Sequence, residues 1–109
     1  MLIFHIVEEK IWQGKFKNEP YGDFLIKEDG FIHCCTFDQI VDVANSNLKD
    51  IGEKIIILCI NTYYLESEIR WEKNNKNGKI FPHVYGEINS ECIIKSIDLE
   101  RNEKGDFFI

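Results

Sequence analysis

The sequence predicts a single α+β domain of five or six short strands, with two helices near the N-terminal half of the chain. Its 109 residues, 44% of them hydrophobic, suffice for one buried core but not for two, so residues 1–109 are assigned to one domain. Runs of β-branched and aromatic residues are short and are separated by turns that contain Gly, Asn or Pro, which is typical of strands. Helical and strand patterns do not alternate regularly, and this favours α+β over α/β.

Strands are predicted where apolar residues run together or alternate with polar ones. The run from Lys54 to Ile60 is continuously apolar after its first residue, as in a central strand covered on both faces. Residues 69–72 alternate, so that Arg70 and Glu72 share one face. The remaining predicted strands are residues 2–7, 31–35, 91–99 and 106–109.

Two helices are predicted in the first half of the chain. Residues 8–16 are acidic at the front and basic at the end, the charge order that suits a helix dipole. A second helix is expected to begin at Thr36, which has the spacing of a capping box with Gln39. Its buried stripe is predicted to be Phe37, Ile40, Val41, Ala44 and Leu48, with Asp38, Asp42 and Asn45 left in solvent.

Several intervening segments are expected to be loops. Residues 18–22 contain a turn signal, and residues 73–79 are rich in Asn, Lys and Gly, which predicts a mobile loop. Pro82 restricts the backbone around it, so residues 81–86 are expected to form a stiff loop that presents His83.

Composition disfavours several classes of partner. The chain has a formal charge of −6, without the excess of basic residues that is typical of nucleic-acid-binding proteins. Neither nucleic acid nor a membrane surface is therefore expected as a partner. Glu8 and Glu9 stand where a signal peptide would continue, and the longest apolar run, residues 55–60, is far shorter than the ~18 residues of a membrane span. The chain is therefore expected to be cytoplasmic, with its four cysteines reduced.

Two histidines are predicted on apolar strands. His5 shares a face with Ile3 and Val7, and His33 shares one with Phe31 and Cys35. A buried imidazole needs hydrogen-bond partners, so each can be a satisfied core histidine or part of a cleft floor. Two such strands side by side would bring both rings to one cleft.

Further candidate binding groups follow in the second half of the chain. Arg70 and Glu72 can meet one ligand or simply pair with each other as a surface salt bridge. His83 lies on the predicted stiff loop, and the phenol of Tyr85 can stack or donate a hydrogen bond.

A metal site and a reactive cysteine are both disfavoured. Zinc ligands occur as close pairs, whereas Cys59 and Cys92 stand alone, so no metal is predicted. Cys35 precedes a predicted helix N-terminus, which can lower a thiol pKa, but an inert thiol is the commoner case.

Several motifs in combination resemble one known family. They are residues 4–6 (Phe-His-Ile), 30–36 (Gly-Phe-Ile-His-Cys-Cys-Thr) with Gln39, 58–60 (Leu-Cys-Ile), 70–72 (Arg-Trp-Glu) and 81–86 (Phe-Pro-His-Val-Tyr-Gly). Over nearly the whole chain they resemble the uncharacterised bacterial family known as domain of unknown function 952. One departure is Cys35, where the family usually has serine.

The resemblance implies the fold of the ADP-ribosylation superfamily. That fold is an ADP-ribosyltransferase-like split antiparallel β-core of two small sheets around a cleft, which holds NAD in the active members. By the same resemblance, His5 holds the nicotinamide-side ribose and Glu72 stabilises the oxocarbenium-like centre. The expected binding residues are His33, Arg70, His83 and Tyr85, with Arg70 and His83 at the pyrophosphate and Trp71 as another candidate for stacking on the nicotinamide.

The leading hypothesis is a cleft that binds NAD or a related phosphorylated ribonucleotide and transfers or hydrolyses its ADP-ribosyl part. NAD is then the candidate substrate. The alternative is a noncatalytic module that recognises a small anionic ligand or a partner protein, so whether the chain is an enzyme stays open. A third interpretation treats the histidines as internally satisfied architecture. The sequence does not predict the oligomeric state.

Overall fold

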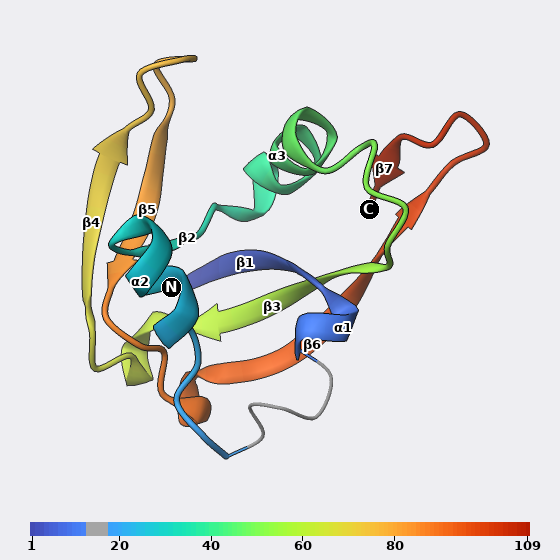
Figure 1. Ribbon diagram of the computed structural model, residues 1–109. Helices are drawn as coiled ribbons and strands as arrows, with labels where there is room; N and C mark the ends of the chain where they lie inside the picture. Colours follow the sequence, from blue (N-terminus) through green and yellow to red (C-terminus); the bar gives the residue numbers. More distant parts are fainter. Residues whose placement is uncertain (13–17) are drawn as a thin grey trace.

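The computed structural model describes residues 1–12 and 18–109 and has a mixed α+β architecture with antiparallel sheets (Figure 1). The larger sheet has the strand order β1-β3-β6-β7 and the smaller one β2-β5-β4. The strands are β1 (Leu2–Glu8), β2 (Ile32–His33), β3 (Ile55–Asn61), β4 (Glu68–Lys73), β5 (Ile80–Tyr85), β6 (Ile93–Arg101) and β7 (Phe107–Phe108). The helices are α1 (Glu9–Trp12), α2 (Asp23–Asp29) and α3 (Ile40–Asn47), with short 3₁₀ turns η1 (Phe37–Gln39), η2 (Thr62–Tyr64) and η3 (Ser90–Cys92).

Strand β3 is the central strand of the larger sheet, as its unbroken apolar run predicts. It pairs with β1 on one side and β6 on the other, and residues 55–60 are all buried. Its side chains alternate between two cores. Ile56, Leu58 and Ile60 pack toward the smaller sheet with Ile32 and Val84. Ile55, Ile57 and Cys59 pack with Ile40 and Ala44 of α3 on the other face.

Strand β5 is the central strand of the smaller sheet, which corrects the prediction of a stiff loop over residues 81–86. It pairs with β4 along six residues and with β2 along two. The short β2 pairing has a local cause. The carbonyl of Pro82 accepts from the Cys34 N–H at 3.2 Å, but proline has no N–H to return, so the ladder ends at His33.

The two sheets are joined where the segment after β2 crosses the edge of β1. Phe4 and Cys35 exchange both backbone hydrogen bonds at 2.8 Å. This bridge places the C-terminal end of β2 directly beside the middle of β1. Residues of both predicted histidine motifs are therefore neighbours in space.

Helix α3 begins as the capping-box prediction requires, although its first turn is 3₁₀. Thr36 and Gln39 form the capping box around η1. The predicted stripe is partly wrong: Phe37 is 57% exposed, and it is Val43 that packs against the core with Ile40, Ala44 and Leu48. Asn45, predicted to face solvent, instead clamps β7, accepting from the Phe107 N–H at 2.7 Å and donating to its carbonyl at 3.3 Å.

The N-terminal helices differ from the predicted helix over residues 8–16. Residues 2–8 form β1, α1 occupies Glu9–Trp12, and the rest of that prediction lies outside the described residues. The helix α2 was not predicted. Gly22 precedes it with φ +108°, a conformation that glycine adopts readily.

The remaining strand predictions are confirmed in part, since the expected strand over residues 31–35 contains only the two residues of β2. The expected strand over residues 91–99 begins later, because Ser90–Cys92 form η3. The last strand is only Phe107–Phe108. Among the described residues the eight-residue α3 is the longest helix, too short to span a bilayer.

Candidate functional site

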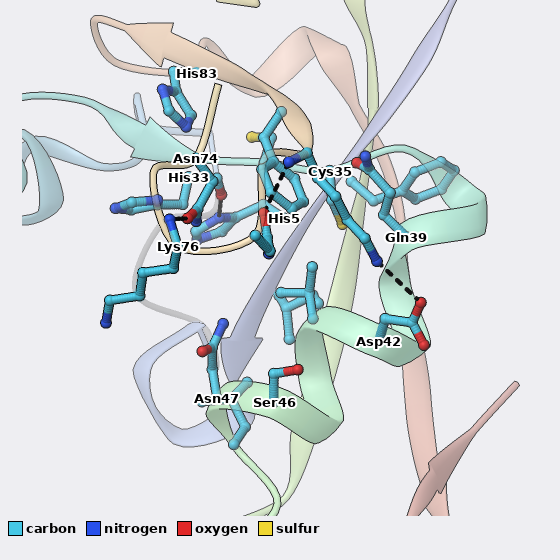
Figure 2. A pocket seen from close by; sticks show the side chains of 18 of the residues that line it. His5, His33, Cys35, Gln39, Asp42, Ser46, Asn47, Asn74, Lys76 and His83 are labelled. Atoms are coloured by element: carbon cyan, nitrogen blue, oxygen red, sulfur yellow. Dashed lines mark hydrogen bonds and ion pairs between the residues drawn. The ribbon is translucent and has the colours of Figure 1, made fainter. Parts of the chain in front are cut away.

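A hollow of about 940 Å³ lies between α3, the β4–β5 hairpin and the junction of β1 with β2. Apolar side chains that line it include Phe4, Ile6, Val43, Leu48 and Phe81. Polar side chains surround them: Figure 2 shows His33, His83, Asn74 and Lys76 on one side, and Ser46 and Asn47 of α3 across from them. We call this space the α3–hairpin hollow.

Two contacts tie the hairpin to the η1–α3 segment and so hold one wall of the hollow. The Gln39 side chain donates to the carbonyl of Ile80 at 3.0 Å, and Lys79 pairs with Asp42 at 3.6 Å. The hairpin turn is closed by backbone bonds between Asn74 and Lys79 and between Gly78 and Asn74, both 2.8 Å. The predicted loop over residues 73–79 thus includes an internally hydrogen-bonded turn, and it lines the hollow.

Register across the smaller sheet gathers polar side chains on one face. His83 lies opposite His33 on β2 and opposite Arg70 on β4. Because side chains alternate along strands, Glu72 and Tyr85 share this face. The sequence prediction that Arg70 and Glu72 lie on the same side of their strand agrees with this register.

Glu72, His83 and Tyr85 form a compact hydrogen-bonded cluster. One carboxylate oxygen of Glu72, Oε1, accepts from the Tyr85 hydroxyl at 2.5 Å and from His83 Nδ1 at 2.8 Å. The hydrogen bond from Tyr85, followed by that from His83, lowers the pKa of Glu72, while the pKa of Tyr85 is raised because its hydroxyl donates to Glu72. Glu72 is therefore held as an ionised acceptor.

The imidazole of His33 is more exposed to solvent than that of His83. Its Nε2 lies 3.3 Å from Asp29 of α2, and its side chain is 62% exposed. Desolvation lowers the pKa of His33, and the nearby His83 lowers it further, while Asp29 acts in the opposite direction. Phe31 contacts both rings, stacked on His83 at 4.0 Å and tilted against His33 at 4.7 Å, while the two imidazoles meet edge to face at 5.5 Å.

His5 lies beneath the hollow with both ring nitrogens engaged. Its Nδ1 lies 2.6 Å from the carbonyl of His33 and its Nε2 lies 2.8 Å from the hydroxyl of Tyr21. A carbonyl only accepts, so Nδ1 carries the proton and the Tyr21 hydroxyl donates to Nε2. Burial lowers the pKa of His5 to about 4, which keeps the ring neutral.

Arg70 lies outside the hollow. Its Nε donates to Glu68 at 2.9 Å, and its guanidinium covers the Tyr85 ring at 4.2 Å. An Arg70–Glu72 salt bridge, one of the two alternatives that the sequence left open, is therefore not formed, and Arg70 pairs with Glu68 instead. Since both Arg70 and Glu68 side chains are more than half exposed, this pair contributes little to stability.

The structure thus divides the six predicted site residues into two groups. Three of them line the hollow: His5, His33 and His83. The other three, Arg70, Glu72 and Tyr85, lie on the same face of the smaller sheet as His83 but do not line the hollow, and Glu72 is connected to it by its hydrogen bond to His83.

Contributors to the site that were not singled out from the sequence include Tyr21, Asp29, Phe31 and Lys76. Strand alternation places Phe31 beside His33, so that signal was present. Tyr21 and Asp29 depend on helix α2, which was not predicted, and Lys76 belonged to a segment interpreted only as a loop.

The cysteines are buried thiols. All four are free, and burial, reinforced by the charge of Asp38, raises the pKa of Cys35 to about 12. The helix start beyond Cys35 therefore does not generate a thiolate. Among residues 1–12 and 18–109, no group of three or more His, Cys, Asp or Glu side chains is arranged to hold a metal ion.

Comparison with known proteins gives a family and a fold. A family model described as "Protein of unknown function (DUF952)" matches residues 6–96. No curated protein matches significantly. The X-ray crystal structure of protein CC0527 from Caulobacter crescentus is similar, with 22% sequence identity and a TM-score of 0.81 over 99% of this chain and 94% of that chain. The solution NMR structure of CC0527 gives 23% identity and a TM-score of 0.76 over 96% and 90%.

Proposed function

Because this chain belongs to the family described as "Protein of unknown function (DUF952)", whose description states no activity, we propose a function from the site itself. The protein binds a phosphorylated ribonucleotide of the NAD class in the α3–hairpin hollow. The observation that carries the proposal is the hollow, whose volume of about 940 Å³ lies at the upper end of the ~300–1,000 Å³ typical of small-molecule sites.

The lining of the hollow suits the parts of such a ligand. Flat rings of a base or nicotinamide can pack on the apolar lining and beside Phe31. Phosphates suit Lys76, which has no ion pair with any carboxylate in the described part of the chain, together with the side-chain amides of Asn74, Asn75 and Asn77. A ligand with both apolar rings and negative charge uses both parts of the lining.

Transfer or hydrolysis of the ADP-ribosyl group is the reaction that we assign to this ligand. Two antiparallel sheets around a hollow are consistent with an ADP-ribosyltransferase-like fold, and this likeness is part of the proposal. Cleavage of the glycosidic bond builds positive charge on the ribose. The ionised carboxylate of Glu72 is one hydrogen bond away from the hollow, through His83, and its negative charge favours that positive centre from there without contact.

A noncatalytic binding module is the second candidate, and one observation favours it. Glu72 does not line the hollow, and its Oε1 is already occupied by Tyr85 and His83. Ligand binding without turnover is the behaviour expected of such a module.

Titration with NAD and with ADP-ribose, combined with an assay for released nicotinamide, tests the proposal. Both nucleotides should raise the melting temperature in a concentration-dependent way, because they bind the folded state. Reversal of charge in Lys76→Glu should weaken binding roughly tenfold. The matched control is Lys104→Glu, which makes the same charge change on a lysine that does not line the hollow.

The outcomes separate the candidates. Stabilisation with nicotinamide release supports the enzyme, and stabilisation without release supports the module. If neither nucleotide stabilises the protein, or if both lysine variants weaken binding equally, nucleotide binding in this hollow is contradicted.

A further inference from the structure

Glu72 and His83 have the geometry of a carboxylate–imidazole pair in which only the imidazole borders the hollow. The Oε1–Nδ1 distance is 2.8 Å, and the His83 side chain is 13% exposed against 39% for Glu72. His83 lines the hollow, whereas Glu72 does not. The carboxylate is therefore connected to the hollow through the imidazole ring.

The hydrogen bond determines which nitrogen of His83 carries the proton. An ionised carboxylate only accepts, so the neutral ring must be protonated at Nδ1. Its Nε2 then holds a lone pair and has no hydrogen-bond partner among the described residues. This is the state of an imidazole ready to accept a proton.

Two further contacts hold the pair in place. Tyr85 donates to the same Glu72 oxygen at 2.5 Å, which restrains the carboxylate. The Phe31 ring stacks on His83 with a centroid distance of 4.0 Å and an interplanar angle of 19°, which restrains the plane of the imidazole. A general base is effective when its orientation is determined in advance in this way.

The other two histidines do not have this combination. His5 has both nitrogens engaged, by His33 and Tyr21. The ring of His33 is 62% exposed, and its ion-pair distance to Asp29 is longer, at 3.3 Å. Only His83 combines a close carboxylate, a stacked ring and a free nitrogen among these residues.

We infer that His83 is the general base of the site and that Glu72 is its positioning residue. The inference rests on the proposed function, because it takes the NAD-class nucleotide as substrate and water as the nucleophile. Water oxygen forms a bond to the ribosyl C1′ as the bond from C1′ to the nicotinamide nitrogen breaks. The bonding electron pair leaves with neutral nicotinamide, His83 Nε2 takes the water proton, and that proton passes to solvent.

The tautomer of His83 can be measured without any ligand, by ¹⁵N–¹H NMR of the imidazole rings at alkaline pH. We expect His83 to be protonated at Nδ1 and bare at Nε2. In Glu72→Gln the population protonated at Nε2 should rise. Glu68→Gln, a change of the same kind on the same face of β4, should leave the His83 signals unchanged. A wild-type ring protonated at Nε2 would overturn the inference.

Kinetics give the second test. His83→Gln should lower nicotinamide release from NAD by roughly 100-fold or more, the usual contribution of a general base, while NAD affinity changes little. Glu72→Gln should lower turnover with the histidine retained, which covers the case of a poorly folded His83 variant, and Glu68→Gln should not.

The results distinguish this inference from the proposal beneath it. NAD that binds but is not hydrolysed by the wild type, or hydrolysis unaffected in both Glu72→Gln and His83→Gln, overturns the general base and leaves binding in place. Absence of any NAD binding overturns the proposed function, and with it the inference that His83 is the general base for hydrolysis of NAD.

Discussion

His5 and His83 differ chiefly in what surrounds their ring nitrogens. Both stand on strands among apolar residues, and both were candidates for a nucleotide site. His5 is 5% exposed and bonded at both nitrogens, as in the core interpretation. His83 is bonded at one nitrogen only. Alternation along a strand indicates which side a residue faces, but it does not indicate how many partners that residue finds.

The pH dependence of stability should show the neutral state of His5. The pKa of His5 is lowered from 6.5 to about 4 in the folded protein, so the unfolded chain binds the proton first as pH falls. The contribution of His5 to the free energy of unfolding should therefore be complete above pH 6.5, and the free energy should decrease by about 3 kcal/mol between pH 6.5 and pH 4.

Urea unfolding across this range measures the effect. His5→Gln should flatten the decrease. Part of the slope remains in that variant, because the pKa of His33 is also lowered. Equal slopes for the two proteins would show that His5 is not buried in its neutral form.

Tyr21→Phe tests the partner of His5. Loss of the hydroxyl leaves a buried ring nitrogen without its donor, which should cost about 1–3 kcal/mol of unfolding free energy. Tyr63→Phe removes a hydroxyl from a side chain that is 83% exposed and should change stability by much less. Similar unfolding midpoints for both variants would contradict the His5–Tyr21 hydrogen bond.

At the scale of elements, predictions succeeded where neighbours in sequence determine the secondary structure, and failed where contacts between distant strands determine it. The unbroken run over residues 55–60 can only be covered on both faces, and the Thr36–Gln39 capping box depends on neighbours in sequence. Residues 80–85 form a central strand despite Pro82, because its backbone nitrogen, which carries no hydrogen, faces the end of β2, where few ladder hydrogen bonds are lost. Asn45 likewise found its partner in β7, 62 residues away.

The entry to α2 depends on close approach of the backbone at Gly22. A Cβ built there would lie 2.2 Å from Cδ1 of Ile32, and φ is +108°. Gly30 ends the same helix with φ +86° but has open space around it. Both alanine substitutions incur the left-handed backbone penalty, whereas only Gly22→Ala also crowds the core.

Gly22→Ala should therefore lower the unfolding free energy by about 1–3 kcal/mol more than Gly30→Ala does. Chemical denaturation of the two variants measures the difference. If they are equally stable, the contact between Gly22 and Ile32 does not constrain the helix.

At the scale of the whole molecule, the site arises because the two sheets meet at β1 and β2. The Phe4–Cys35 bridge brings His5 beneath His33, and β2–β5 pairing brings His33 opposite His83. The sequence predicted convergence of the histidines from the expectation that their strands lie side by side. It could not predict that α3 and the β4–β5 hairpin would enclose a hollow beside them, because that depends on packing between distant elements.

Packing between distant elements also determines which of the six predicted site residues line the hollow and which do not. Strand register places Glu72 on the same face as His83, where it bonds to the ring but does not itself line the hollow. Of the residues predicted to contact one ligand, His83 therefore borders the hollow, and Glu72 is connected to it through the His83 ring.

The central claim is that a phosphorylated ribonucleotide occupies the α3–hairpin hollow, and an NMR titration of backbone amides with ADP-ribose tests it most directly. We expect the largest shift changes at His33, at residues 74–77 and at residues 46–48, which border the hollow, and little change at exposed Tyr63 and Tyr64. Changes centred on those tyrosines, or no change with millimolar ligand, would contradict the account.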